Sequence, residues 1–475
     1  MYATKSAKRP PFDTVIQAIV DYVYDVDVTH NELAMSTARY CLMDTLGTGY
    51  LALNYPACTK LLGPVVPGAT LKNGARVPGT DFELDPIQAA FNIGAMVRWL
   101  DFNDTWLAAE WGHPSDNLGA ILACADYQVR NNHAQYTMKN VLAWMIKAHE
   151  IQGVLALNNS FNRVGLDHVI LVRIASTAVA SQILGLTKAQ ALNAVSNAWV
   201  DNGVLRTYRH APNTGSRKSW AAGDACARAV RLALIAKTDE MGYPSALTAK
   251  TWGFNDVMMK DKPVTLAQPL GTYVMENILL KISFPAEFHA QTAVEAGCQL
   301  HSEITNRLDA IEKIVIQTQE SAVRIIDKTG PLDNPADRDH CLQYMTAIAL
   351  LKGDLVAEDY EDDVASDPCV DALRDKMIVE ENPRFTREYL EADKRSIGNA
   401  VQVFFNDGTQ TENISIDYPI GHRCRREEGI PVLVEKAKRN IATQLSAEKT
   451  VNLMQVLSDQ KTLEAMSVLA FMACV

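Results

Sequence analysis

HVILVRIASTAVASQILGL, residues 168–186, decides the fold class of the first half of the chain. Apolar residues recur in it at the three- and four-residue spacings of an α-helix, and they leave little polar face. Residues 31–53, 86–100 and 138–157 share this pattern. Helices without a polar face must be buried among other helices, so the sequence predicts a large helical bundle from about residue 12 to residue 270.

The hydrophobic period changes near residue 308. IEKIVIQT, residues 311–318, alternates as a half-buried strand does. Residues 400–418 predict a hairpin whose turn is Asn406-Asp407-Gly408. We therefore expect a second, α+β domain from about residue 275 to residue 425.

Two segments lie between these strands, and one follows them. CLQYMTAIALLKG, residues 341–353, predicts an apolar helix, and the acidic residues 358–367 are typical of a solvated loop or helix end. Residues 447–472 are helical in pattern again. This last segment is expected to return to the first domain.

Composition excludes several classes of function. The 475 residues carry a formal net charge of −11 at pH 7 and no long basic stripe, which argues against nucleic-acid binding. No apolar run reaches the roughly 20 residues of a membrane span. The start, residues 1–17, lacks the apolar core of an export signal. We expect a protein of the cytoplasm, or of the mitochondrial matrix in a eukaryote, that binds a small molecule.

The nine cysteines are scattered, and no C-x-x-C pair occurs. Reduced thiols in a reducing compartment are expected, and an iron–sulfur cluster is not. Gly47-Thr48-Gly49 imitates part of a dinucleotide fingerprint, but no strand precedes it. The sequence therefore predicts no bound cofactor.

WLDFNDTWLAAEWGHPSDN, residues 99–117, combines three tryptophans with four acids and a histidine, and it contains no lysine or arginine. Asp101, Asp104 and His113 are acceptable ligands for a hard metal ion. No paired-histidine spacing accompanies them, so metal binding is the less favoured interpretation. His113, His168, His210 and His289 each have polar neighbours, although a single histidine is most often structural.

The strongest local concentration of cations lies in residues 206–225, RTYRHAPNTGSRKSWAAGDA. Arg206, Arg209, His210, Arg217 and Lys218 occupy a loop that leads into a predicted helix, where free backbone N–H groups also favour anions. A solvated basic loop is the alternative interpretation. We expect these cations to bind substrate carboxylates and to neutralise the acids of residues 99–117.

Six motifs together resemble the MmgE/PrpD family, over nearly the whole chain. They occupy residues 99–117, 162–168, 206–225, 281–296, 334–340 and 417–422. The resemblance implies a mainly α fold, with a large helical domain of residues 1–272 completed by residues 430–475. It also implies a smaller α+β lid domain of residues 273–429 and an active site in the cleft between the two.

The resemblance further implies a hydro-lyase that dehydrates 2-methylcitrate to 2-methyl-cis-aconitate in propionate degradation, without an iron–sulfur cluster and with side activity on citrate. The family's site residues match Asp101, Thr105, His113, His168 and Lys218. Its lid-domain histidine matches His289.

Dehydration needs a base, a proton for the leaving hydroxyl and cations for the developing charge. Asp101, His113 and His168 are the candidates for acid and base, and their order is open. Lys218 is the foremost candidate cation.

Two alternatives stay open. The same scaffold could decarboxylate cis-aconitate or hydrate aconitate, and a different class would be a non-catalytic tricarboxylate-binding protein. The sequence leaves the oligomeric state open, with a homodimer as one option.

Overall fold

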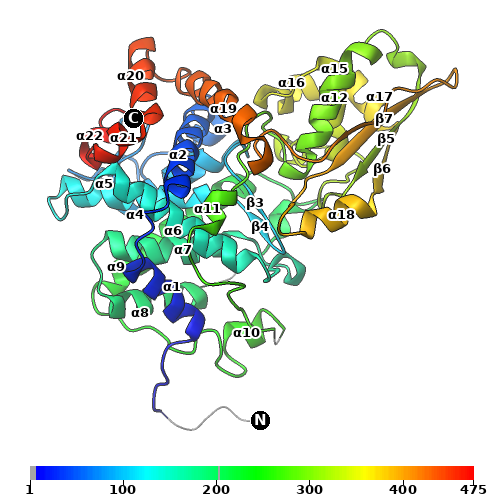
Figure 1. Ribbon diagram of the computed structural model, residues 1–475. Helices are drawn as coiled ribbons and strands as arrows, with labels where there is room; N and C mark the ends of the chain where they lie inside the picture. Colours follow the sequence, from blue (N-terminus) through cyan, green and yellow to red (C-terminus); the bar gives the residue numbers. More distant parts are fainter. Residues whose placement is uncertain (1–6, 202–203, 261) are drawn as a thin grey trace.

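The computed structural model describes residues 7–201, 204–260 and 262–475, and it consists of a large helical body and a smaller body built around a sheet (Figure 1). The prediction of a mainly α fold is confirmed. Residues 1–6, on which part of the expectation about an export signal rests, lie outside the described residues. Within the described part, no helix combines the length and apolarity that crossing a membrane requires.

The long helices of the first body occur where the hydrophobic period predicts them. Residues 31–53, 86–100, 138–157 and 168–186 form α2, α4, α6 and α7, each within a few residues of the predicted ends. The helices of this part of the chain are α1 (Thr14–Asp25), α2 (Glu32–Ala52), α3 (Pro56–Thr59), α4 (Pro86–Arg98), α5 (Leu118–Arg130), α6 (Met138–Ala156), α7 (Val169–Ile183), α8 (Lys188–Val200), α9 (Arg217–Ala236), α10 (Phe254–Val257) and α11 (Tyr273–Asn277).

The C-terminal segment returns to this helical body, as expected from its pattern. It forms four helices, coloured orange to red in Figure 1: α19 (Arg426–Ile441), α20 (Ala447–Ser458), α21 (Gln460–Ala465) and α22 (Val468–Phe471). Helix α19 packs along α2, and α22 packs against α5.

A close helix crossing brings two parts of the site together. At this crossing a Cβ added to Gly94 of α4 would lie 2.8 Å from the Gly223 Cα of α9, so only glycine fits. The backbones can therefore touch, and the end of α4 lies beside the start of α9. There the Ser219 hydroxyl donates to the Trp99 carbonyl over 3.0 Å.

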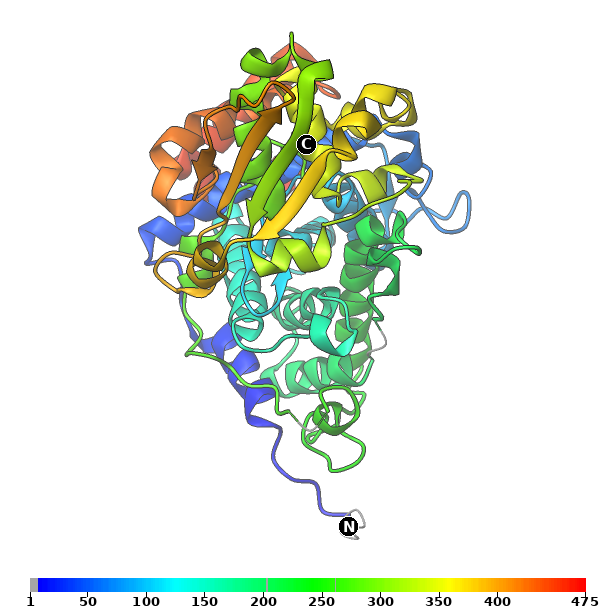
Figure 2. The ribbon, with the colours of Figure 1, turned by 90° about the vertical axis from the view of Figure 1, so that its right-hand side faces the viewer.

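The smaller body is a four-stranded sheet in the order β6-β5-β7-β8, seen face-on in Figure 2. Strand β5 pairs in parallel with β6 and antiparallel with β7, which pairs antiparallel with β8. The predicted strand and hairpin are confirmed, whereas β6 has no counterpart in the sequence prediction. The strands are β5 (Ile311–Thr318), β6 (Met377–Glu381), β7 (Asn399–Phe405) and β8 (Ile414–Ile416).

The helices of this body pack mainly on one another and on the sheet, with α12 against β7, β8 and α15. The predicted apolar helix is α15, which ends at Gly353 in the left-handed conformation. The acidic residues 358–367 contain two short helices and the buried Tyr360. The helices are α12 (Gln291–Ile304), α13 (Glu320–Ile325), α14 (Pro335–Arg338), α15 (Leu342–Lys352), α16 (Asp362–Ala365), α17 (Pro368–Arg374) and α18 (Pro383–Leu390).

Each body has a separate hydrophobic core, and two segments pass between the cores. Residues 273–282 follow the predicted boundary at residue 272, yet Met275, Leu280 and Ile282 belong to the helical core. In the opposite direction, the hairpin of β3 (Trp106–Leu107) and β4 (Trp111–Gly112) inserts Leu107 and Trp111 into the core of the smaller body. A second small ribbon, β1 (Ala75–Arg76) with β2 (Glu83–Leu84), lies in the helical body.

Candidate active site

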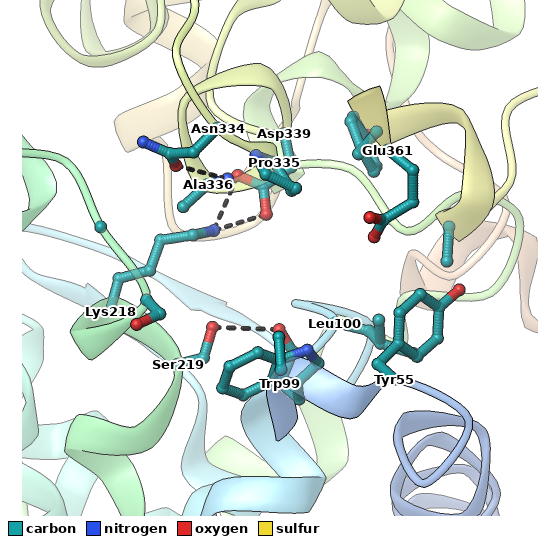
Figure 3. Close-up of a pocket in the computed structure, with 15 residues that line it drawn as sticks. Tyr55, Trp99, Leu100, Lys218, Ser219, Asn334, Pro335, Ala336, Asp339 and Glu361 are labelled. Carbon is teal, nitrogen blue, oxygen red and sulfur yellow. Dashed lines mark hydrogen bonds and ion pairs between the residues drawn. The ribbon is translucent and has the colours of Figure 1, made fainter. Parts of the chain in front are cut away.

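A cavity of about 380 Å³ lies where the two bodies meet (Figure 3). From the helical body it is lined by Trp99, at the end of α4, and by Lys218 and Ser219, at the start of α9. From the smaller body it is lined by α14 with the adjacent Asp339 and by residues 357–361. A volume of this size is typical of small-molecule sites. Lys218 and Asp339 line the cavity, and on their buried side they adjoin a cluster of polar side chains that includes His340 and Asp101.

Asp101 is the most heavily paired carboxylate of this cluster. Its Oδ1 lies 2.8 Å from Arg98 Nη1 and 2.8 Å from Lys281 Nζ, and Lys281 also donates to the Asp101 carbonyl over 2.6 Å. The backbone φ of Asp101 is +50°, in the left-handed region that aspartate tolerates better than most residues. Burial opposes ionisation, but Arg98 and Lys281 hold the pKa of Asp101 well below its usual range.

His113 extends from the β3–β4 hairpin toward Asp101. Its Nδ1 lies 2.7 Å from the Asp104 carbonyl oxygen, so Nδ1–H donates there, and Thr105 Oγ1 is 3.4 Å from the same nitrogen. Its Nε2 lies 3.6 Å from Asp101 Oδ1. Burial and the charge of Arg98 lower the pKa of His113 well below the usual value, so its ring is neutral at pH 7.

His168 stands beside His113, with 5.8 Å between the ring centres. It is buried, and neither of its ring nitrogens has a hydrogen-bond partner among the described residues. Buried polar groups without partners are rare in native structures and often mark a place for a ligand. Burial also lowers the pKa of His168 well below its usual value.

Lys218 lies in the first turn of α9, at the end of this helix that faces the smaller body. Its Nζ lies 2.5 and 2.7 Å from the two carboxylate oxygens of Asp339 and 3.2 Å from His340 Nδ1. Burial lowers the pKa of Lys218, while Asp339 and Asp101 oppose that change. The ion pair therefore connects the helical body to the smaller body at the edge of the cavity.

Two arginines of the 206–218 loop pair with Asp167, which lies outside the acidic stretch of residues 99–117. Arg209 pairs with Asp167 through Nε and Nη2, the latter 3.2 Å from Asp167 Oδ1, and Arg206 Nη1 lies 3.9 Å from Asp167 Oδ2. The ion pairs of these two arginines are therefore made with Asp167 and not with the acids of residues 99–117, although the charge of Arg206 still lowers the pKa of Glu110 against the effect of burial. A buried guanidinium pairs with the nearest buried carboxylate, and the fold supplies Asp167.

Two members of that loop lie at the surface. His210 is exposed and accepts a hydrogen bond from Arg206 Nε over 3.1 Å. Arg217 pairs with Asp224 and lies over the Trp220 ring, with 40% of its side chain exposed. Neither side chain lines the cavity.

The remaining acids of residues 99–117 have partners outside the cation-rich loop. Asp104 contacts His149 Nε2 at 2.7 Å and accepts from the Ser115 N–H, and its pKa is lowered although burial opposes this. Asp116 accepts a hydrogen bond from the Asn103 side-chain amide, and Glu110 accepts one from the Asn162 side-chain amide. Burial raises the pKa of Asp116 to about 7 and that of Glu110 to about 7.

His289 lies within the smaller body, behind the cavity. Its Nδ1 is 2.7 Å from Glu287 Oε1 and its Nε2 is 3.2 Å from the Tyr389 hydroxyl. Its ring packs edge-on against Trp111. Both nitrogens are occupied, so in this conformation His289 has none to offer a substrate.

Two buried groups have donor sets that a metal ion could use, among the residues that the structure describes: Cys41, Asp104 and His149, and Asp101, Asp339 and His340. In the second group, Lys218 holds both oxygens of Asp339 and Lys281 holds Asp101 Oδ1. Ammonium groups thus occupy the positions of a cation, and the donor set does not fit a metal ion. Of the combination considered from the sequence, Asp104 lies in the first group, Asp101 in the second and His113 in neither.

Sequence reasoning assigned no role to several residues of this site. Arg98 lies three positions before Asp101 at the end of α4, a spacing that predicts contact on a helix. The motifs quoted above contain the others without indicating what they touch: Asp167, Lys281, Asp339 and His340.

Fold and site together define a two-domain protein with a cationic, histidine-rich small-molecule site between a helical domain and a smaller α+β domain. The MmgE/PrpD N-terminal domain model matches residues 17–267, and the MmgE/PrpD C-terminal domain model matches residues 284–460. The chain belongs to the MmgE/PrpD family.

Several similar proteins cover nearly the whole chain. A 2-methylcitrate dehydratase of Cupriavidus necator is 63% identical over 472 residues, covering 98% of this chain and 97% of the relative. A 2-methylcitrate dehydratase of Salmonella typhimurium is 61% identical, covering 97% and 96%. A mitochondrial 2-methylcitrate dehydratase of Yarrowia lipolytica is 59% identical, covering 91% and 85%.

Proposed function

We propose that this protein is a hydro-lyase that removes water from 2-methylcitrate and forms 2-methyl-cis-aconitate, the dehydration step of the methylcitrate cycle in propionate degradation. The observation that carries the proposal is one connected cluster of Asp101, His113, His168 and Lys218 beside the interdomain cavity, in a chain that is 59–63% identical to proteins named 2-methylcitrate dehydratase.

The charge of the cluster suits a substrate with three carboxylates. Arg98, Lys281 and Lys218 contribute three positive charges, and Asp101 and Asp339 contribute two negative charges, so the cluster is net positive while its histidines are neutral. Such a site attracts a polyanion and stabilises the negative charge that develops when a proton leaves carbon. Lys218 is the cation that borders the cavity.

The binding of the substrate changes the proton balance of the site. His113 and His168 are neutral because burial and nearby arginines disfavour their charged forms. Three incoming carboxylates favour the imidazolium form, so the pKa of each histidine rises in the complex. A histidine that gains a proton on binding is able to protonate the leaving hydroxyl.

Asp101 acts as an anchor in this proposal. Its pKa stays low because Arg98 and Lys281 hold it ionised, although burial opposes this, and so tightly paired a carboxylate is a weak base. The acid that protonates the leaving hydroxyl is therefore sought first among His113 and His168 of the helical domain, with Thr105 and the buried Arg206 and Arg209 as contributors to substrate binding. Roles in the site are less well supported for three of the predicted residues. His210 and Arg217 lie at the surface, outside the cavity lining, and both ring nitrogens of His289 already have partners.

The experiment that tests the function uses chelator-treated protein with 2-methylcitrate, citrate or cis-aconitate, each supplied separately. Ultraviolet absorbance reports the conjugated double bond, and carbon dioxide release is measured in parallel. We expect absorbance to grow fastest with 2-methylcitrate, without carbon dioxide. Some turnover of citrate is expected as well, because one methyl group discriminates by only about 1–3 kcal/mol.

Other results would replace this proposal. Carbon dioxide from cis-aconitate would identify a decarboxylase, and faster reaction of aconitate would identify an aconitate hydratase. Tight citrate binding without turnover would identify a tricarboxylate-binding protein. Activity abolished by chelator and restored by a divalent cation would contradict metal independence.

The compartment and assembly are part of the same proposal. Similar proteins occur in bacteria, and one from a yeast is named mitochondrial. We place this protein in the cytoplasm of a bacterium, or in the mitochondrial matrix if the source is a eukaryote, with a small tricarboxylate as its partner. A homodimer stays a prediction, which light scattering of the purified protein tests.

A further inference from the structure

A histidine without an assigned role faces Asp101 from the smaller domain. His340 follows α14 and is buried, with 9% of its side chain exposed. Its Nδ1 lies 2.7 Å from Asp339 Oδ1, and its Nε2 lies 3.9 Å from Asp101 Oδ2. Asp339 and Lys218, its immediate neighbours, line the interdomain cavity (Figure 3).

The contacts of His340 determine which of its nitrogens carries the proton. The carboxylate of Asp339 is ionised, because Lys218 and His340 lower its pKa although burial opposes this. Nδ1 of His340 has two neighbours, Asp339 Oδ1 at 2.7 Å and Lys218 Nζ at 3.2 Å. The carboxylate is the nearer of the two and can only accept, so the Nδ1–H of His340 donates to Asp339, while Lys218 donates to the oxygens of the same carboxylate. Nε2 then has a free lone pair, and 3.9 Å is too far for a hydrogen bond to Asp101.

A proton that arrives on Nε2 is stabilised by a carboxylate on each side of the ring, against the opposing charge of Lys218 Nζ 3.2 Å from Nδ1. The imidazolium would lie between the carboxylates of Asp339 and Asp101, at 2.7 and 3.9 Å. His113 also faces Asp101, at 3.6 Å from its Nε2, but its Nδ1 donates to the neutral carbonyl of Asp104 and not to a second carboxylate. A carboxylate stabilises an imidazolium more strongly than a carbonyl does, so His340 is the better proton acceptor of the two.

We propose that His340 is the general base of the dehydration and that Asp339 is its positioning residue, an inference that rests on the proposed function. His340 Nε2 takes the proton from the methyl-bearing carbon next to the substrate carboxylate. The electrons of that C–H bond form the C=C bond, and the C–O bond to the hydroxyl breaks. The hydroxyl leaves as water with a proton from an acid of the helical domain, so base and acid approach the substrate from opposite domains.

The charged and titratable groups that face His340 come from four segments. They are Lys218 of α9, Asp101 after α4, the adjacent Asp339, and Glu287 before α12. Burial and Lys218 lower the pKa of His340 in the free protein. His340 is therefore unprotonated at pH 7 in the free protein, and the acid limb of the kcat/KM profile, which reports the free protein, is expected below the usual histidine value.

The test compares His340→Gln with His301→Gln. His301 is a histidine of the same domain, on α12, whose Nδ1 contacts the Leu350 carbonyl at 2.9 Å. Turnover of 2-methylcitrate is followed from pH 5 to 9, and binding of 2-methyl-cis-aconitate is followed by calorimetry. We expect His340→Gln to lower kcat at least about 100-fold, to lose the acid limb and to bind the product within about threefold of the parent protein. The His301→Gln profile should match that of the parent.

The inference is overturned if His340→Gln keeps kcat within about threefold, or if its residual activity keeps the acid limb. If His340→Gln does not fold, Asp339→Asn replaces it. Removing this carboxylate destabilises the imidazolium, so kcat should fall and the acid limb should move to lower pH. An unmoved limb in Asp339→Asn also overturns the assignment. A parent protein that does not dehydrate 2-methylcitrate contradicts the proposed function, and this is seen before any variant is measured.

Discussion

Two pairs of carboxylates in residues 99–117 are equally buried and yet differ in charge state. Asp101 and Asp104 have pKa values below their usual range, although burial opposes this. Burial raises the pKa values of Glu110 and Asp116 to about 7 in each case. All four side chains lie within one short segment, so neither depth nor sequence neighbourhood explains the difference.

The partners of each carboxylate explain it. Asp101 contacts two cationic side chains at 2.8 Å, and Asp104 contacts His149 at 2.7 Å. Asp116 Oδ2 is 4.0 Å from Arg98, and one oxygen each of Glu110 and Asp116 has no hydrogen-bond partner among the described residues. Direct pairing keeps a buried acid ionised, whereas amide hydrogen bonds and a more distant arginine, Arg206 for Glu110 and Arg98 for Asp116, leave its pKa raised by burial.

The largest expected effect comes from replacing the paired acid. Asp101→Asn leaves Arg98 and Lys281 without their carboxylate, which costs about 3–5 kcal/mol of unfolding free energy for a broken buried pair. We also expect kcat/KM to fall at least about 100-fold. Urea unfolding and the absorbance assay measure the two effects.

The matched control is Asp116→Asn, the same isosteric change in the same segment. Asp116 is already partly protonated at pH 7, so the expected loss of unfolding free energy is below about 1 kcal/mol. Equal losses in the two variants would show that direct pairing does not distinguish these acids.

Lys218→Ala removes the cation that borders the cavity and is expected to lower kcat/KM at least about 100-fold. It also leaves the buried Asp339 without its cationic partner, so the thermal midpoint should fall. Lys218→Arg keeps the charge and should recover most of the stability while recovering less of the activity, because guanidinium geometry differs from that of ammonium. A nearly active Lys218→Ala protein would remove Lys218 from the proposed mechanism.

The acids with raised pKa values predict a pH dependence of stability. Their folded pKa values, about 7, exceed the ordinary values of about 4 in the unfolded chain. Between these values the native state holds protons that the unfolded state has lost, so stability falls as pH rises from about 4 to 7. The double variant Glu110→Gln, Asp116→Asn should flatten this fall by on the order of 1–3 kcal/mol. Urea unfolding at a series of pH values measures it, and parallel curves would contradict the assignment.

The smallest effects are expected at the surface of the basic loop. His210→Ala and Arg217→Ala remove side chains that lie at the surface, outside both the cavity lining and the buried cluster around Asp101, so kcat/KM should stay within about threefold of the parent value. Arg209→Ala is the matched comparison in the same loop, because it leaves the buried Asp167 without its main partner. A large loss in His210→Ala would mean that this loop folds over the substrate.

The fold was predictable from the sequence to the extent that periodicity determines it. The four buried helices and strand β5 occur within a few residues of their predicted positions, because their patterns extend over many residues. Strand β6 was missed because MIVEE, residues 377–381, is short and pairs at the edge of the sheet, where alternation carries little signal.

The motifs predicted that Asp101, His113, His168 and Lys218 belong to one candidate site, but they did not predict which residues each of these side chains pairs with. Asp101 contacts Lys281 from 180 positions away, and Lys218 contacts Asp339 from 121 positions away. Local sequence cannot tell a buried charge which distant partner it will find. For this reason the two buried arginines of the basic loop pair outside the acidic stretch.

The hairpin at residues 106–112 limits how the two domains can be recombined. Its Leu107 and Trp111 fill the core of the smaller domain, although the chain on either side belongs to the helical one. A chimera that exchanged only the smaller domain would place two foreign side chains in its core and would displace His113, the residue that follows the hairpin. Modular exchange within this family would therefore have to transfer residues 106–112 together with the smaller domain.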